Sequence, residues 1–543
     1  MKRIGFLLVL CIISLGLKGQ VNIIKDNLNG KDDGVPHANP VDQLLIVFKD
    51  KLVFTGTNRY VDLSTDGDYE PWIYDPTINS IGILKDIVPL KSSNPNKYVN
   101  AGDKFYFGAT DEFFLVDRLF VSDGTKNGTL NMGDTINKLS GMLRNFSRNT
   151  IVPINNGVLF NAYVSSTEFG LWYSNGTSTG TINLNKDGFA DNFIYHPKYK
   201  VALFTQNSAF IISDGTIGGT RALNDLLNIS SVASASVDMG TFKDDFVMEA
   251  LDPNTGTFGF FRTNGILQTY TKLVDFGNLP SQARNVTDIG NGRFIFSNKR
   301  GIWVSDGTPA GTALVANIVP FKADNFYTDL WAAYKGKVYF AASDPMNNKG
   351  VELYESDGTI AGTKLFMDLN SGSGDGMPYN FVVYHDILYF SATSASAGNE
   401  LWQSDGSVIG TKMIADINTG TGSSNPQHIT GLGDNLYFFA SDGKTGYELW
   451  KYGGAKVGVQ NVLRDHSLYL YPHWASQYVE LQYEEGSADQ VIISNLNGCQ
   501  VKDIKLSGSI GHLDVQELSP GYYILSLYHE GNRVAVRKLF KPE

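Results

Sequence analysis

Cysteine is nearly absent from the sequence. Only Cys11 and Cys499 occur among the 543 residues. Cys11 lies in an apolar N-terminal stretch that we expect to be removed on export, which leaves Cys499 without a partner for an intramolecular disulfide. Lipoprotein processing at Cys11 is disfavoured, because Leu10 before it is bulkier than the small residue that this cleavage prefers. A small secreted scaffold held together by disulfides is therefore excluded.

Apolar runs long enough to cross a membrane are also missing. The main apolar run, residues 4–17, follows the basic pair Lys2-Arg3 and falls short of the ~20 residues that a membrane-spanning helix needs. A basic segment followed by a short apolar run is typical of a secretory signal peptide. We therefore expect residues 1–20 to be a signal peptide and the mature protein to be exported through the periplasm, without a transmembrane segment.

Motifs of common enzymes and metal sites are absent as well. The eight histidines are scattered, and none has the His-x-x-x-His or Glu-x-x-His spacing of a zinc site. No phosphate-binding loop occurs. The net charge of −11 argues against non-specific binding to nucleic acid or anionic lipid. We predict no catalytic residue, no cofactor, no metal and no nucleic-acid partner.

A repeated two-strand unit dominates the rest of the chain. In residues 400–417, Leu401 and Trp402 open a short apolar strand, residues 404–407 have turn chemistry, and a partner strand follows. Asp405 can accept hydrogen bonds from the backbone two residues on, and Gly406 suits a positive φ. No long 3.6-residue apolar period appears anywhere, so the class is all-β.

This turn recurs along the chain. Its Asp position is occupied at Asp75, Asp123, Asn175, Asp214, Asn264, Asp306, Asp357, Asp405 and finally Gly453. The eight intervals between residues 75 and 453 average about 47 residues. We predict that the turns at Asp123-Gly124, Asp214-Gly215, Asp306-Gly307, Asp357-Gly358 and Asp405-Gly406 are structural, although they are similar to the Asp-boxes of sialidase-like propellers and could be read as ligands.

A period of this length with about four strands per unit is typical of propeller blades. We predict a large β-propeller of about nine four-stranded blades over residues 21–453. Residues 21–26 supply the strand that is missing after residues 447–452, which closes the ring and removes exposed sheet edges. A count of eight is the alternative if one eroded unit is miscounted.

The repeat resembles a known family. Glu-Leu-Tyr-Glu-Ser-Asp-Gly-Thr at 352–359 and Glu-Leu-Trp-Gln-Ser-Asp-Gly-Ser at 400–407 resemble bacterial surface proteins with Glu-Leu-Trp-x-x-Asp-Gly-Thr (ELWxxDGT) repeats. The resemblance covers about residues 21–453 and is most specific in the seventh to ninth units. It implies an extracellular propeller-like protein and brings no catalytic residues.

The C-terminal part differs in character. We expect a linker at 454–466 and, over 467–543, seven short strands in a small Ig-like β-sandwich. This module resembles the C-terminal sorting domain of type IX secretion cargo from Bacteroidetes-like bacteria. The resemblance includes Tyr471, Pro472, Gly498, Pro520, Gly521 and Lys538. It departs at His473-Trp474, where Asn-Pro is usual, and at Cys499, where a basic residue is common. The resemblance implies the type IX secretion machinery as a partner and a secreted or outer-membrane surface-attached protein.

The loops between blades are the predicted ligand face. They comprise residues 418–427, 370–379, 321–329 and 186–197, with the loops at 343–350 and 441–447. The candidate ligand residues are Tyr195, His196, Lys322, Tyr327, Asp375 and Tyr379. For His196, a surface or strand-end position is favoured over a place in a ligand loop. Calcium is unsupported, because residues 368–376 carry alternating oxygen donors but have Tyr379 where a closing Glu is needed.

Two functions remain in competition at this point. The leading hypothesis is a non-enzymatic surface propeller that binds an extracellular protein or glycan through these loops. The alternative is a secreted hydrolase or lyase acting on polysaccharide, with acids from several blades. Glycosidases hold two carboxyl groups about 5–5.5 Å or about 6.5–9.5 Å apart, so convergence of two acids distinguishes the two.

Overall fold

The computed structural model describes most of the chain after the expected leader. The described residues are 20–25, 33–36, 43–57, 68–89, 91–110, 117–135, 151–165, 168–185, 188–207, 209–223, 230–231, 239–252, 254–264, 269–321, 331–343, 349–453, 469–471, 478–482, 489–495, 500–506, 510–529 and 532–542. Residues Val21–Gly453 form one compact unit, and Gly454–Glu543 belong to a second. Residues 1–19 of the expected leader and the expected linker at 454–466 lie outside the described residues.

The eighth blade shows how the repeat folds. It contains β31 (Tyr379–Tyr384), β32 (Ile387–Ser394), β33 (Gly398–Ser404) and β34 (Lys412–Ala415), paired in that order and all antiparallel. In the two central strands, the consecutive apolar residues 388–390 and 401–402 are buried. Because side chains alternate between the faces of a strand, both faces of the blade are covered.

Seven further blades repeat this order from innermost to outermost strand. The first three are β2 (Leu45–Phe48), β3 (Lys51–Gly56), β4 (Glu70–Asp75) and β5 (Ser80–Ile83); β6 (Asn96–Ala101), β7 (Lys104–Thr110), β8 (Asp117–Ser122) and β9 (Leu130–Asn131); and β10 (Ile151–Ile154), β11 (Gly157–Ser165), β12 (Glu168–Ser174) and β13 (Thr181–Asn185). The fourth is β14 (Asp191–His196), β15 (Val201–Gln206), β16 (Ala209–Ser213) and β17 (Arg221–Ala222). The fifth is β18 (Ser230–Ser231) and β19 (Gly240–Phe242), both beside β20 (Asp245–Asp252), then β21 (Thr257–Asn264) and β22 (Thr269–Gly277). The sixth and seventh are β23 (Arg284–Gly290), β24 (Arg293–Asn298), β25 (Gly301–Ser305) and β26 (Ala313–Ala316); and β27 (Trp331–Tyr334), β28 (Lys337–Ser343), β29 (Val351–Ser356) and β30 (Lys364–Met367).

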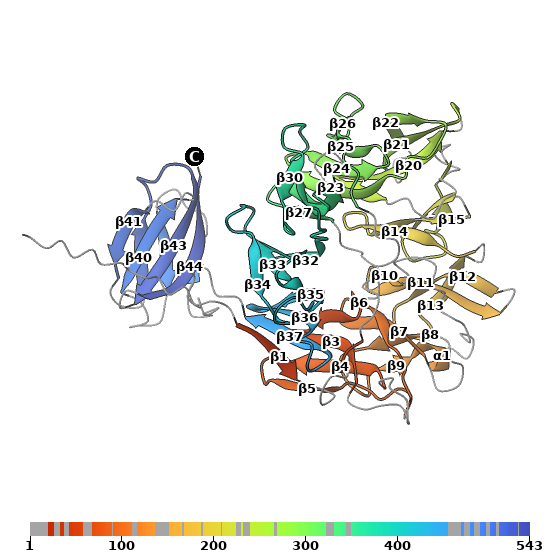
Figure 1. The fold of residues 1–543 in the computed structure, drawn as a ribbon, viewed down its shortest axis with the longest axis horizontal. Coiled ribbons are helices and arrows are strands. Elements are labelled where there is room, and N and C mark those ends of the chain that lie inside the picture. Colours follow the sequence, from red (N-terminus) through yellow and green to blue (C-terminus); the bar gives the residue numbers. More distant parts are fainter. Residues whose placement is uncertain are drawn as a thin grey trace, which may run out of the picture. The chain divides into compact units, whose positions relative to one another are not determined.

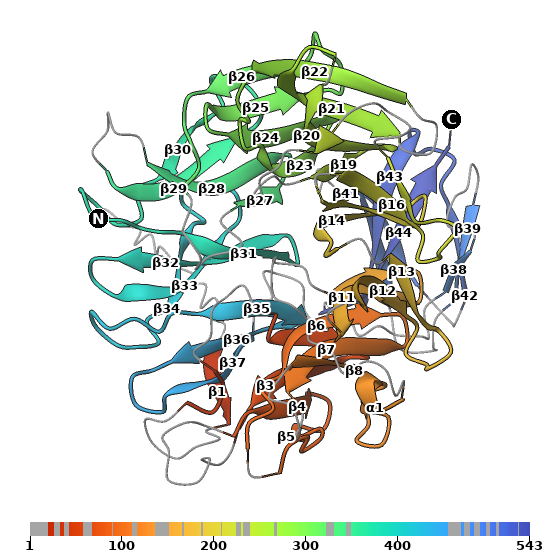
Figure 2. The same cartoon turned by 90° about the vertical axis from the view of Figure 1, so that its right-hand side faces the viewer.

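The ninth blade closes the ring. It consists of β35 (Gln427–Leu432), β36 (Asn435–Ser441), β37 (Tyr447–Gly453) and, as its outermost strand, β1 (Gln20–Lys25). Both views show the first and last strands of the propeller side by side (Figures 1 and 2). The innermost strands contact one another in an unbroken circle from β2 round to β35 and back to β2. The predicted all-β propeller is confirmed, and the described sheets of the propeller number nine.

The core of the propeller is divided among the joints between blades. Each joint has its own cluster of buried apolar residues, drawn from two neighbouring blades. At the joint between the eighth and ninth blades, Leu401 packs with Phe438 and Trp450. At the joint between the ninth and first blades, Phe439 packs with Phe54 and Trp72. No blade has a core of its own, so closure of the ring is needed to bury the last two faces.

The second unit is a small β-sandwich, as predicted. One sheet has the order β38 (Tyr469–Tyr471), β39 (Tyr478–Gln482) and β42 (Ile510–Asp514). The other has the order β41 (Gln500–Lys505), β40 (Gln490–Asn495), β43 (Gly521–His529) and β44 (Asn532–Lys541). Their apolar side chains share one core.

Helix is nearly absent from the described part of the chain. It contains one short helix, α1 (Met132–Thr135). No helix found there has the length and apolar character needed to cross a membrane.

Candidate functional site

The antiparallel order of the strands gives the propeller two different faces. In the eighth blade, the turn at 385–386 and the turn at 405–411 lie at one end of the strands; we call this side the turn face. The connection at 395–397 and the loop at 416–426, which leads into the ninth blade, lie at the other end; we call this side the loop face. The same assignment holds for the equivalent segments of the other blades where the structure describes them.

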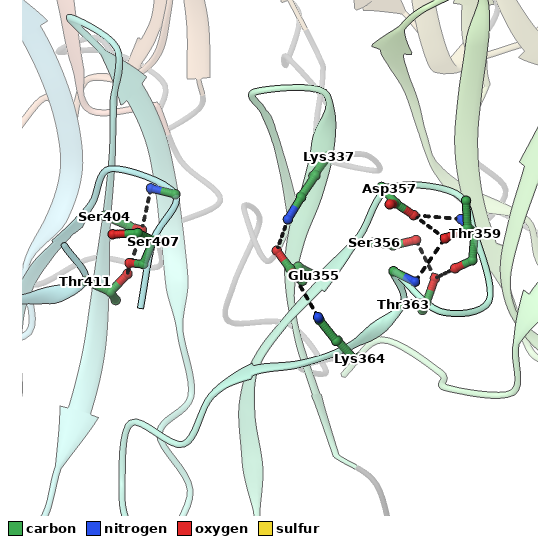
Figure 3. Close-up of polar contacts among 12 residues, drawn as sticks. Lys337, Glu355, Ser356, Asp357, Thr359, Thr363, Lys364, Ser404, Ser407 and Thr411 are labelled. Carbon is green, nitrogen blue, oxygen red and sulfur yellow. Dashed lines mark hydrogen bonds and ion pairs between the residues drawn. The ribbon is translucent and has the colours of Figure 1, made fainter. Parts of the chain in front are cut away.

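The Asp turns on the turn face are closed by their own hydrogen bonds. Asp357 Oδ1 accepts from Thr359 N at 2.9 Å and from Thr359 Oγ1 at 2.7 Å. Thr359 Oγ1 accepts from Gly362 N at 2.9 Å, and Thr363 Oγ1 donates to Thr359 O at 2.7 Å (Figure 3). Ser356 Oγ and Thr363 Oγ1 lie 2.7 Å apart at the base of the turn. These polar atoms are engaged within the turn, which favours a structural role.

The same network recurs in other blades. It is present at Asp123, Asn175, Asp214, Asp306 and Asp405. The hydrogen bond from Thr308 lowers the pKa of Asp306, and that from Ser407 lowers the pKa of Asp405. The glycine after each Asp has φ between 79° and 91°, a conformation that suits glycine.

The turns also contact the preceding blade. Lys49 Nζ donates to Asp123 O at 3.2 Å, and Lys335 Nζ donates to Asp405 O at 3.0 Å. Close packing accompanies these bonds, because a Cβ on Gly124 would lie 3.2 Å from the ring of Phe48 in the first blade. The turns therefore hold neighbouring blades together.

The candidate ligand residues do not come together on one surface. Tyr379 is buried and donates to Asn399 Oδ1 at 3.0 Å. Asp375 is exposed on the loop face, where its Oδ1 accepts from Val351 N at 2.7 Å. Lys322 and Tyr327 lie outside the described residues.

The structure places Tyr195 and His196 at the turn face and not in the predicted loop face. They end β14, immediately before the turn into β15, and so lie at the turn face. Residues 188–190 lie in an inter-blade loop, and β14 then crosses the blade to the turn face. His196 is buried, with its ring 4.7 Å from that of Tyr199 and 5.3 Å from that of Phe246. It is thus a strand-end residue packed among aromatic rings.

Five buried glutamates form the feature that the sequence analysis missed. We call Glu70, Glu249, Glu352, Glu400 and Glu448 the latch glutamates; all are at most 1% exposed. Four of them stand where the Glu-Leu-Trp motif places its Glu, but the motif alone gives that residue no role.

Each latch glutamate accepts hydrogen bonds from the loop that leads into the next blade. Glu400 accepts from Ile417 N at 3.0 Å, from Asn418 N at 3.3 Å and from Ser424 N at 3.1 Å. Ser424 Oγ adds a further bond of 2.5 Å. Glu352 accepts from Leu369 N at 2.6 Å and Gly376 N at 2.8 Å.

The ninth blade is held in the same way, since Glu448 Oε1 accepts from Gly34 N at 3.0 Å. The latch glutamates therefore fix the loop face from beneath.

Burial shifts the protonation of these carboxyl groups. It raises the pKa of Glu70 to about 8 and that of Glu352 to about 7, and it raises the pKa of Glu400. Asp68 adds to the effect at Glu70 and Asp368 adds to it at Glu352, while the hydrogen-bond donors oppose it. Raised carboxyl pKa values can mark a general acid. Here the groups are sealed from solvent and bonded to backbone, so an external substrate has no access to them.

Several polar atoms of the loop at 368–376 are engaged by contacts within the protein. Asp368 Oδ2 pairs with Lys349 Nζ at 2.6 Å, and Asn370 Nδ2 donates to Asp375 O at 3.0 Å. Within the described ranges, no three His, Cys, Asp or Glu side chains gather in a way that could hold a metal ion.

Comparison with known proteins identifies the C-terminal module. Residues 469–541 match the secretion system C-terminal sorting domain. Tyr471 ends β38, Gly521 begins β43 directly after Pro520, and Lys538 lies in β44; Pro472 and Gly498 lie outside the described residues. This domain indicates export by the type IX route, ending in surface attachment or secretion. No curated protein matches the chain.

Several solved structures resemble the chain at low identity. A puromycin hydrolase is 11% identical with a TM-score of 0.34, and the match covers 76% of this chain and 62% of that one. PorZ, a surface component of the type IX secretion system of Porphyromonas gingivalis, is 11% identical with a TM-score of 0.34 and 92% and 69% coverage. The β-propeller domain of the Trilobed protease from Pyrococcus furiosus is 13% identical with a TM-score of 0.33 and 69% and 97% coverage. These values assign no activity to this chain.

The turn network predicts the effect of substitutions at Asp357. We expect Asp357→Ala to lower the free energy of unfolding by about 1 kcal/mol, because Thr359 loses two hydrogen bonds in an exposed turn. Asp357→Asn should stay close to the native protein, since Asn175 makes the same two bonds to Thr177 at 3.1 Å and 2.7 Å. Urea unfolding of both variants checks this, and equal losses would contradict it.

The raised pKa values predict a dependence of stability on pH. The folded protein keeps protons that the unfolded chain releases, on Glu70 between about pH 4.5 and 8 and on Glu352 between about pH 4.5 and 7. Stability therefore falls as pH rises through these windows. Melting temperatures measured from pH 5 to 8.5 should decline, and Glu70→Gln with Glu352→Gln should make the decline shallower. An unchanged slope in the double variant would show that these groups do not titrate as described.

Proposed function

We propose that the chain is an exported surface propeller that binds an extracellular protein or glycan through its loop face, without catalysing a reaction. The observation that supports binding is the way in which the loop face is held. Loops of neighbouring blades are fixed by buried carboxylates, so their backbone is ordered before a partner arrives. Such pre-organisation lowers the entropic cost of association.

The exposed part of these loops suits a polar partner. Ser371, Ser373 and Asp375 are exposed in the loop after the seventh blade, and Thr419 and Thr421 are exposed in the loop after the eighth. Hydroxyl groups can both donate and accept hydrogen bonds. A surface that combines them with a carboxylate fits sugar hydroxyls or the backbone of a peptide.

The burial of the latch glutamates argues against the polysaccharide-cleaving alternative. Glycoside cleavage needs a pair of accessible carboxyl groups on either side of the bond. The carboxyl groups most strongly raised in pKa, those of Glu70 and Glu352, are buried and bonded to loop backbone. We therefore give binding precedence over catalysis.

A glycan array, a screen against extracellular proteins and a hydrolysis screen on the purified full chain test this proposal. We expect binding, and a loss of at least tenfold in affinity for Ser371→Arg combined with Thr419→Arg on the loop face. Ile360→Arg is the matched control, because Ile360 is 77% exposed in a turn-face loop. Turnover of a glycan that is abolished by replacing one carboxylate would overturn the binding proposal.

The sorting domain predicts the fate of a truncated protein. We expect a chain lacking residues 469–541 to fold its propeller but to accumulate in the periplasm, because the secretion machinery no longer recognises it. Cell fractionation with immunoblotting measures the distribution. Arrival of the truncated chain at the surface or in the medium at native levels would show that the route does not depend on this domain.

A further inference from the structure

The contact between a buried acid and one loop position recurs in separate blades. Ser424 Oγ donates to Glu400 at 2.5 Å, and Ser93 Oγ donates to Glu70 at 2.7 Å. Ser281 donates to Glu249 from its backbone N at 2.5 Å and from its Oγ at 3.1 Å. Each serine lies three residues before the first residue of the innermost strand of the next blade, so each bond fixes the end of an inter-blade loop.

The acid in the fifth blade reaches this loop from a different strand. In the eighth blade Glu400 is on the third strand, opposite Ala392. In the fifth blade the equivalent place, opposite Ala250, is Gly259. The carboxylate comes instead from Glu249 on the second strand, which also accepts from Ala283 N at 2.6 Å. The sequence motif is lost here, but the contact with the loop is kept.

The third blade keeps the contact with an amide. Asn161 on the second strand occupies the place of Glu249, and Gly170 on the third strand occupies the place of Gly259. Asn161 Nδ2 donates to Ala190 O at 2.7 Å, and its Oδ1 accepts from Ala190 N at 2.9 Å. A Glu on the third strand, a Glu on the second strand and an Asn on the second strand thus make the same kind of bond to an inter-blade loop.

We infer that Glu70, Glu249, Glu352, Glu400 and Glu448, together with Asn161, are positioning residues of the loop face. This inference rests on the proposed function, because positioning matters only if the loop face binds. Apolar side chains would fill these buried places at no desolvation cost. A buried carboxyl group that accepts several backbone N–H groups instead makes directional bonds to the loop. Unlike an apolar side chain, it fixes the backbone conformation of the loop whose N–H groups it bonds.

Moving the carboxylate within the eighth blade tests this directly. Ser391 is opposite Leu401, as Glu249 is opposite Phe260, so Ser391→Glu places an acid where the fifth blade has one. We expect Glu400→Gly to speed amide hydrogen exchange of residues 417–424 by at least tenfold. The double variant Glu400→Gly with Ser391→Glu should recover most of this protection. Exchange of residues 369–376, held by Glu352, serves as the internal reference.

Two further variants separate positioning from general stability. Gln403→Gly, on the same strand as Glu400 but towards the turn face, should leave exchange of residues 417–424 at its native rate. If Glu400→Gly fails to fold, Glu400→Gln keeps the side-chain volume and should still speed exchange several-fold. Native exchange in the Glu400 variants, or no recovery in a folded double variant, would overturn the inference.

Binding measurements on the same variants separate this inference from the proposed function. With a partner identified by the screens, Glu400→Gly should weaken binding and the double variant should restore it. If exchange responds as expected but binding does not, the glutamates hold the loops and the loop face is not the binding surface. That outcome would overturn the positioning role in binding and the proposed function, and would leave the attachment of the loops established.

Discussion

Apolar packing between neighbouring blades is the constraint on which the propeller depends. A blade buries side chains on both of its faces and therefore needs two neighbours. Phe390 and Trp402 of the eighth blade pack towards the seventh, while Tyr389 and Leu401 pack towards the ninth. Only a closed ring satisfies this condition for every blade. The split ninth blade follows, since pairing of β1 with β37 completes the last sheet.

The two faces use different chemistry to connect blades. On the turn face, the Asp turns bond within themselves and contact the preceding blade, as Asp405 does through Lys335. On the loop face, buried acids receive backbone N–H groups from the segment that enters the following blade. The first arrangement makes small, closed turns. The second supports longer loops with exposed polar tips, which is why the loop face is the better candidate for recognition.

Much of the fold could be predicted because it follows from local signals. The regular spacing of the Asp turns predicted the blades. The strand that is missing from the last unit and present at the start of the array predicted the closure of the ring. The candidate ligand residues were harder to place. His196 was included with the candidate loop residues, although a strand-end position was favoured, because the direction of β14 through the blade is not visible in one segment of sequence. Glu249 could not be recognised at all, because its role depends on a strand register and a loop more than 30 residues away.

Closure by the two ends of the propeller has a consequence for the order of folding. The partners in the pairing of β1 with β37 are separated by more than 400 residues, whereas the other strands of each blade are neighbours in sequence. The entropic cost of joining distant segments grows with their separation. The local hairpins can therefore form early, and the ring becomes complete only when the final strand of the propeller meets the first. Until then the chain is an open arc with two unsatisfied apolar faces, and a protease or chaperone would distinguish this state from the finished ring.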